Sequence, residues 1–268
     1  AVTLLGIGHL PVKAADGVHP IVAVKSGYLL GATAGGRWLK ATKAAHGIAP
    51  SGRYRIYSLT GAMGTGTGSR PKSQGAPCED TLFVNLHRTN GKSLAGAEVA
   101  VGCSWPAMRR VPQLEPTNQR LYRNVIRGIL RQHGIRDPRV HISQVLRVDL
   151  DGDGAAEVLI TATHYASTSA GSDSIPGHST QAGDYSIVVL RKMVRGRVRN
   201  IVIDGEFYTK GSPFAAPNTS RVIGILDLKG DGKMEIITQS RYYEGDSVAV
   251  WQVTGSRVRN VLSEGCGA

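Results

Sequence analysis

The residues best suited to chemistry are the carboxylates of one short, glycine-rich loop, called loop one here, which runs from Asp149 to Glu157. Asp151, Asp153 and Asp149 occupy alternate positions, and Glu157 follows four residues after the last of them. Alternating carboxylates can converge on one hard cation while glycines let the backbone turn around it. With the carbonyl oxygen of Ala155 and water, they supply the roughly six or seven oxygen ligands that suit calcium. Loop one therefore predicts a structural Ca²⁺ site; the alternative is a bare turn of mutually repelling carboxylates.

A second loop, called loop two, has the same spacing in a degenerate form. Asp227, Asp231 and Glu235 match the first, third and last acids of loop one, and the carbonyl of Lys233 matches that of Ala155. Lys229 stands where loop one has its second aspartate, and a protonated lysine has no lone pair for a metal. We expect the Lys229 ammonium to lie among the carboxylates and replace the ion. Loop two would then be a lysine-filled pseudo-site, the alternative being that both loops bind calcium.

The two loops belong to an internal repeat. Residues 147–165 align without a gap with residues 225–243, and the tetrapeptide Arg-Val-Arg-Asn at 197–200 recurs at 257–260. Apolar, β-branched runs bounded by glycine follow each loop and predict antiparallel strands that form one blade-sized sheet per repeat. These runs are 158–161, 186–190 and 198–203 in the first repeat, and 236–238, 248–253 and 258–262 in the second. A Ser/Gly-rich insertion at 166–182 predicts a mobile surface loop in the first repeat only.

The ninth and twelfth positions of loop one indicate which kind of calcium loop it is. An EF-hand loop needs a glutamate at its twelfth position, but that position here is Ile160, within a β-branched run. An acid at the ninth position that leads directly into a strand resembles the calcium loops of FG-GAP and VCBS repeats, the blade repeats of integrin-α-like propellers. The resemblance covers residues 145–263 and implies a propeller-like fold. Closure stays open, because only two repeats are visible and a closed propeller has about four blades or more.

We expect a mainly β fold of antiparallel, blade-like repeats with one amphipathic helix before the first repeat. An apolar stripe predicts this helix at 118–133, with Thr117 as N-cap and Gly134 as its end. Residues 1–112 form an N-terminal β-rich region, either degenerate blades or a separate β domain, and residues 113–268 hold the helix and both repeats. Strand-like runs in the N-terminal region are 21–25, 28–32, 37–41, 54–59, 82–86 and 97–103.

Three cysteines and the absence of an apolar span bear on the compartment. Cys78, Cys103 and Cys266 are too few and too far apart for a zinc cluster, so we expect one disulfide and one free thiol. Cys78 can pair with Cys103, or Cys266 can join the tail to either. No stretch approaches the roughly 20 apolar residues that a membrane span needs. The start at Ala1 fits a processed or trimmed product, and we expect a secreted, periplasmic or cell-surface location.

The chain is strongly basic, which suggests an anionic partner. Lys and Arg number 32 against 20 Asp and Glu, a formal charge of +12, and such a surface attracts polyanions. The place to look for this contact is either the basic face of the helix or the arginines of the repeated tetrapeptide, which are Arg197, Arg199, Arg257 and Arg259. The helix face carries Arg120, Arg123, Arg127 and Arg131, a row that could grip phosphates or carboxylates, although a solvated face of a packed helix is the more common explanation. Without a dense basic run with interleaved aromatics, we do not expect a nucleic-acid partner.

No catalytic motif stands out. The glycine-rich stretch at 64–68 lacks the Lys-Ser/Thr pair of a phosphate loop, Ser179 is not in a nucleophile elbow, and His164 and His178 are isolated. We therefore expect a calcium-stabilised binding or interaction module for an anionic polymer or a partner protein. Two alternatives stay open: a structural, self-associating subunit of an extracellular assembly, or a polysaccharide-acting or other hydrolytic enzyme whose N-terminal half carries the chemistry on a scaffold of repeats.

Overall fold

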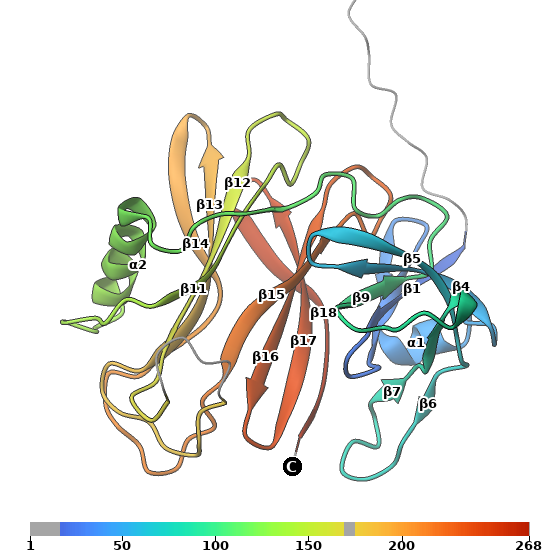
Figure 1. Cartoon of the computed structure of the whole chain (residues 1–268), viewed down its shortest axis with the longest axis horizontal. Helices are drawn as coiled ribbons and strands as arrows, with labels where there is room; N and C mark the ends of the chain where they lie inside the picture. The colour runs from blue at the N-terminus through green and yellow to red at the C-terminus, as the bar shows by residue number, and fades with distance from the viewer. Residues whose placement is uncertain (1–16, 169–174, 268) are drawn as a thin grey trace, which may run out of the picture.

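The strands collect into three large antiparallel sheets that pack in layers (Figure 1). The computed structural model describes residues 17–168 and 175–267 of the chain. The four-stranded sheet lies in the middle, with the five-stranded sheet on one side and the seven-stranded sheet on the other. A fourth sheet has only two strands. The predicted mainly β, antiparallel fold is confirmed, and the sheets of the described residues close no propeller.

The seven-stranded sheet is built from the N-terminal region in the order β3-β2-β1-β9-β4-β5-β8. Its strands are β1 (Val18–Ala23), β2 (Leu29–Ala34), β3 (Arg37–Leu39), β4 (Gly52–Ser58), β5 (Gly61–Gly68), β8 (Leu86–Arg88) and β9 (Val99–Val101). The short helix α1 (Ala41–Ala45) packs on its outer face, and β6 (Lys72–Ser73) pairs with β7 (Leu82–Phe83) beside it. A 3₁₀ turn follows β8 at Thr89–Gly91.

Each repeat forms a run of four consecutive antiparallel strands. In the first repeat they are β11 (Ile142–Val148), β12 (Glu157–His164), β13 (Tyr185–Val194) and β14 (Arg197–Phe207), extended by β10 (Gln113–Leu114). In the second they are β15 (Thr219–Leu226), β16 (Glu235–Tyr242), β17 (Gly245–Thr254) and β18 (Arg257–Gly267). Loop one joins β11 to β12 and loop two joins β15 to β16, so both acidic loops occupy the same place in their sheets.

Buried apolar layers hold the sheets together. The inner faces of the two repeat sheets meet through residues such as Leu146, Leu190 and Ile236, each completely or nearly completely buried. The other face of the four-stranded sheet packs on the seven-stranded sheet. The helix α2 (Arg120–Gln132) buries Ile126 on the outer face of the five-stranded sheet. The two repeats therefore lie between the N-terminal sheet and α2.

Two local predictions need correction. The helix begins at Arg120 and its N-cap residue is Gln119, so Thr117 does not cap it, whereas Gly134 ends it with a positive φ of 89°. The glycine-rich stretch after β4 contains a strand, β5, although it has few apolar residues. A Cβ at Gly68 would lie 2.5 Å from the Tyr54 ring, so glycine there lets β5 approach the core.

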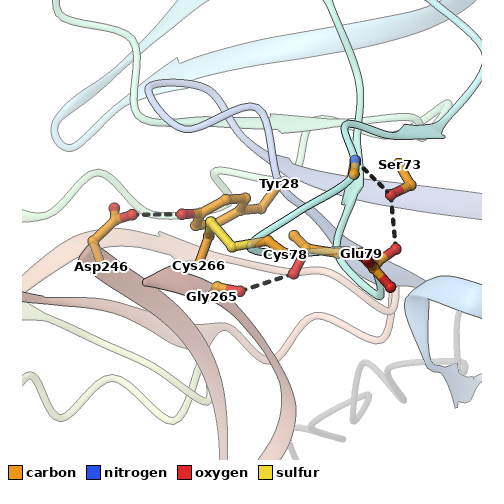
Figure 2. The surroundings of a disulfide bond; sticks show 9 residues. Tyr28, Ser73, Cys78, Glu79, Asp246, Gly265 and Cys266 are labelled. Carbon is orange, nitrogen blue, oxygen red and sulfur yellow. Dashed lines mark hydrogen bonds between the residues drawn. A yellow bond between two sulfur atoms is a disulfide. The ribbon is translucent and has the colours of Figure 1, made fainter. Parts of the chain in front are cut away.

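A disulfide joins the N-terminal region to the end of the chain (Figure 2). Cys78, between β6 and β7, pairs with Cys266 in β18, 188 residues later, which resolves the pairing that the sequence left open. Cys103 is free, and burial raises the pKa of its thiol to about 12. Beside the disulfide, Thr81 donates a hydrogen bond to the carbonyl of Gly265. The Cys78–Cys266 disulfide indicates an oxidising, extracytoplasmic compartment.

The structure also bears on the predicted absence of a membrane span and on the insertion at 166–182. No helix in the described residues is long and apolar enough to cross a membrane. Of the insertion predicted to be a mobile loop, residues 169–174 lie outside the described part. Its later portion is held by backbone hydrogen bonds between Thr180 and Ser212, at 2.8 and 3.0 Å.

Candidate functional site: two acidic loops and an arginine groove

Loop one is held by hydrogen bonds from its own backbone to its first and last acids. The Asp149 carboxylate accepts from the amides of Gly152, at 2.7 Å, and Gly154, at 3.0 Å. Glu157 accepts from the amide of Leu150 at 2.7 Å. Burial raises the pKa of Asp149, but the two amide hydrogen bonds outweigh it and leave the pKa below its usual value. These two acids therefore shape the turn.

Loop two repeats this backbone frame. Asp227 accepts from the amides of Gly230, at 2.6 Å, and Gly232, at 3.0 Å, and Glu235 accepts from the amide of Leu228 at 3.0 Å. The repeat seen in the sequence is thus also a repeat of hydrogen bonds. Both glycines have positive φ, which residues with a side chain rarely adopt.

The alternating aspartates of loop one could hold a metal ion. Asp149, Asp151 and Asp153 each place one carboxylate oxygen within 4.8 Å of the others, and in the described residues no other group of acids, histidines and cysteines comes together in this way. The Oδ1 atom of Asp151 is buried and has no hydrogen-bond partner, which fits a cation ligand. Ala155 donates its amide to Asp153 at 2.8 Å. Glu157 does not belong to this triad.

A lysine that the sequence analysis missed contacts the remaining end of loop one. Lys192, on β13, places its Nζ 2.7 Å from Asp151 and 2.5 Å from Glu157, and its side chain is only 5% exposed. Burial alone would lower the pKa of this ammonium, but its hydrogen bonds to the two carboxylates raise it above the usual value. Lys192 lies 35 residues after Glu157, and no local pattern in the sequence marks it.

The basic side chains around loop two are arranged differently. Lys229 does not lie among three carboxylates as expected: its ion pair is with Asp231, at 3.3 Å. The amide of Lys233 also donates to Asp231, at 3.0 Å. The fully buried carboxylate of Asp227 is instead paired with Arg109 at 3.1 Å. Two acids of loop two are therefore ion-paired: Asp227 with Arg109, which lies outside the loop, and Asp231 with Lys229, which lies within it.

Glu235 is the one acid of loop two without an ion pair among the described residues. Its residue exposure is 2%. Burial, reinforced by the charges of Asp231 and Asp227, raises the pKa of Glu235 to about 8. Its counterpart Glu157 is equally buried but is paired with a lysine. The equivalent glutamate is therefore ion-paired in the first repeat and has no ion pair among the described residues in the second.

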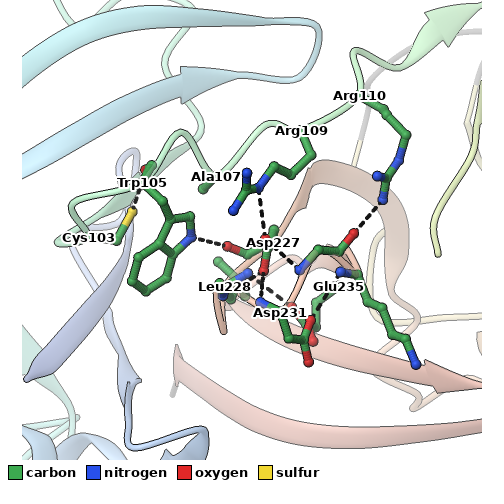
Figure 3. A network of polar contacts seen from close by, with 12 residues as sticks. Cys103, Trp105, Ala107, Arg109, Arg110, Asp227, Leu228, Asp231 and Glu235 are labelled. Carbon is green, nitrogen blue, oxygen red and sulfur yellow. Dashed lines mark hydrogen bonds and ion pairs between the residues drawn. The ribbon is translucent and has the colours of Figure 1, made fainter. Parts of the chain in front are cut away.

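One arginine ties the two loops together. Arg110 donates hydrogen bonds to the carbonyls of Asp149 and Leu150 in loop one, and to the carbonyl of Gly232 in loop two at 2.7 Å. Figure 3 shows this side chain reaching loop two from the segment that links the N-terminal sheet to α2. Because a single guanidinium satisfies carbonyls in both loops, it fixes the spacing between the two repeats.

The same linking segment clamps loop two at Asp227. Trp105 donates its indole N–H to the Asp227 carbonyl at 2.8 Å, and the Asp227 amide donates to Ala107 at 2.7 Å. The amide of Ala107 donates in turn to the Tyr57 hydroxyl at 2.8 Å. Figure 3 shows Trp105 and Arg109 converging on this aspartate. Such dense internal bonding is typical of a structural joint.

The arginines of the repeated tetrapeptide meet in a groove. The turns of the β13–β14 and β17–β18 hairpins and the strand residues next to them line a hollow of about 1020 Å³. Five arginines line it: Arg195, Arg197, Arg199, Arg257 and Arg259. All five are exposed, and none forms a salt bridge with another described residue. No acidic residue lines this hollow, which we call the arginine groove.

The helix arginines lie elsewhere. Arg120, Arg123 and Arg131 are exposed, and Arg127 donates to Asn124 on the same helix at 2.7 Å. The helix packs on the outer face of the five-stranded sheet, whereas the arginine groove opens between the two repeats. The two sets of arginines are therefore separate surfaces.

Comparisons of the chain with protein-family models, with curated proteins and with solved structures found no match.

Proposed function

We propose that the protein is an extracytoplasmic binding module that holds an acidic polysaccharide in the arginine groove. The observation that carries the proposal is the convergence of five unpaired arginines, from equivalent hairpins of two repeats, on one hollow without a carboxylate. Surface arginines normally alternate with acids, which limits local potential. Here the like charges gather, and an anion bound among them would offset their repulsion.

The chemistry of the groove suits carboxylate or sulfate groups. Guanidinium groups offer planar, paired N–H donors that bind such anions in a bidentate manner. A concave site lined by one sign of charge also concentrates field and attracts a polyanion from a distance. The arginines come from both hairpins, so one chain laid along the groove would contact both repeats. The net charge of the chain, +12, also favours a negatively charged partner.

The groove favours a polysaccharide over a nucleic acid. Single-stranded nucleic acids bind by stacking their bases on aromatic side chains as well as by phosphate contacts. No aromatic side chain lines the groove; Ile201 and Val194 supply part of its apolar surface. An acidic polymer without bases therefore matches this lining better.

The acidic loops have a structural role in this proposal. The triad of Asp149, Asp151 and Asp153 could hold a hard cation such as Ca²⁺, but Lys192 already supplies a positive charge to Asp151 and Glu157, and this ion pair stiffens the turn between β11 and β12. Glu157, which the sequence also predicted as an oxygen ligand, is engaged by Lys192. The shared hydrogen-bond frame of both loops supports our inference that the two units are FG-GAP-type repeats. Groove binding itself requires no metal.

The test compares two variants with equal loss of charge. The groove variant replaces Arg197, Arg199, Arg257 and Arg259 by glutamine. The helix variant replaces Arg120, Arg123, Arg127 and Arg131 in the same way. Binding to heparin, used as a model acidic polysaccharide, is measured by calorimetry at several salt concentrations.

We expect binding of the native protein to weaken with salt, because dissolved ions screen the attraction between the arginines and the charged groups of the polymer. The groove variant should bind at least about tenfold more weakly, which corresponds to roughly 1.4 kcal/mol, and the helix variant should bind like the native protein. Equal losses in both variants would show that net charge alone drives binding, and the groove would lose its role. Tighter binding of single-stranded DNA than of heparin would exclude the polysaccharide.

A further inference from the structure

Lys192 occupies the end of loop one that a metal would share. Its ammonium lies between Asp151, at 2.7 Å, and Glu157, at 2.5 Å. Only 5% of the Lys192 side chain is exposed to solvent. These two acids stand at the third and ninth positions of the loop, which are metal-ligand positions in the pattern predicted from the sequence. The lysine therefore neutralises loop one from within the protein.

The burial of this cluster explains why a cation is needed there. Glu157 is 2% exposed, and an uncompensated buried charge is costly. One Glu157 oxygen is satisfied by the Leu150 amide and the other by Lys192. The lysine thus provides the positive charge that the loop would otherwise obtain from an ion.

Strand register brings the lysine to this place. In the first repeat Val158 pairs with Arg191 across β12 and β13, so the next residue, Lys192, lies beside the start of β12. In the second repeat Ile236 pairs with Trp251, and the corresponding next residue is Gln252. Loop two consequently has no lysine at this position.

We propose that Lys192 is the resident cation of loop one, so that loop one, rather than loop two, is the lysine-filled site. A divalent ion at the aspartate triad must compete with this tethered ammonium for Asp151. Removal of Lys192 leaves the triad and its buried, unpartnered Asp151 oxygen available to a metal. This inference is independent of the arginine groove.

The test measures calcium binding by calorimetry and thermal unfolding, in EDTA and in millimolar calcium. We expect the native protein to unfold at the same temperature in both conditions and to give no calcium-binding heat. Lys192→Met should gain one calcium site per chain, which the native protein lacks under the same conditions, because a nearby like charge is removed. Its unfolding temperature should then rise with calcium. Lys229→Met, which removes an ion pair with Asp231 only, should gain no site.

A second variant covers the case in which Lys192→Met does not fold without metal. Glu157→Gln combined with Lys192→Met removes both buried charges and keeps the triad of Asp149, Asp151 and Asp153. It should also bind calcium more tightly than the native protein. The proposal is overturned if the native protein binds one calcium ion as tightly as the variants do, or if neither variant binds calcium.

Discussion

Replacing Glu235 by glutamine should stabilise the protein in neutral and alkaline solution and change its stability little in acid. The carboxyl is buried without an ion pair among the described residues, and its pKa is raised to about 8 by burial and by Asp231 and Asp227. Glutamine keeps the size of the side chain and an oxygen that can accept the hydrogen bond from the Leu228 amide. The substitution therefore removes the charge alone.

The magnitude follows from the difference between the folded and unfolded pKa values of Glu235. Below the ordinary value of 4.5 the carboxyl is protonated in both states, so its contribution to stability is fully present. Above it, the unfolded chain releases a proton that the folded chain keeps, and stability falls by about 1.4 kcal/mol per pH unit until the folded pKa is passed. The native protein should thus lose on the order of 3 kcal/mol by pH 7, and about 5 kcal/mol beyond pH 8.

Urea unfolding, followed by tryptophan fluorescence in EDTA, measures this difference at pH 4.5, 7 and 8.5 as free energies for the native protein and Glu235→Gln. The variant should be more stable at the two higher values, with a gap that widens with pH. The matched control is Glu157→Gln, which leaves the buried ammonium of Lys192 with one partner and should destabilise the protein by about 3 kcal/mol. A Glu235→Gln variant that is no more stable than the native protein at pH 8.5 would refute the reasoning.

Two further predictions concern the joints of the fold. Replacing Cys78 and Cys266 by serine should lower the free energy of unfolding by about 5 kcal/mol, because the bond closes a loop with a sequence separation of 188. Cys103→Ser, the control, should change the urea midpoint little. Arg110→Met should cost about 3 kcal/mol, since carbonyls in both loops lose their donor. Arg120→Met, on the exposed face of α2, should stay near the native midpoint; equal effects would contradict the bridging role.

Local features were predictable because their causes are local. The turn of loop one depends on amides three and five residues after Asp149, and loop two repeats this spacing from Asp227. The β-branched runs bounded by glycine likewise predict the strands that follow each loop. The helix boundary was off by two residues because Thr117 does not act as the cap, and β5 was missed because its contacts depend on small residues approaching Tyr54, which no apolar pattern records.

The sequence by itself determined the mainly β class, the two repeats and the acidic loops, since each depends on residues close together in the chain. Only the tertiary structure decided which cation meets loop one, which cysteines pair and where the basic residues gather. Lys192 reaches Glu157 across a strand pair, and Cys266 reaches Cys78 across 188 residues. The arginine groove forms only where two hairpins pack side by side. Strand register and sheet packing set these contacts, and neither is encoded in the spacing of neighbouring residues.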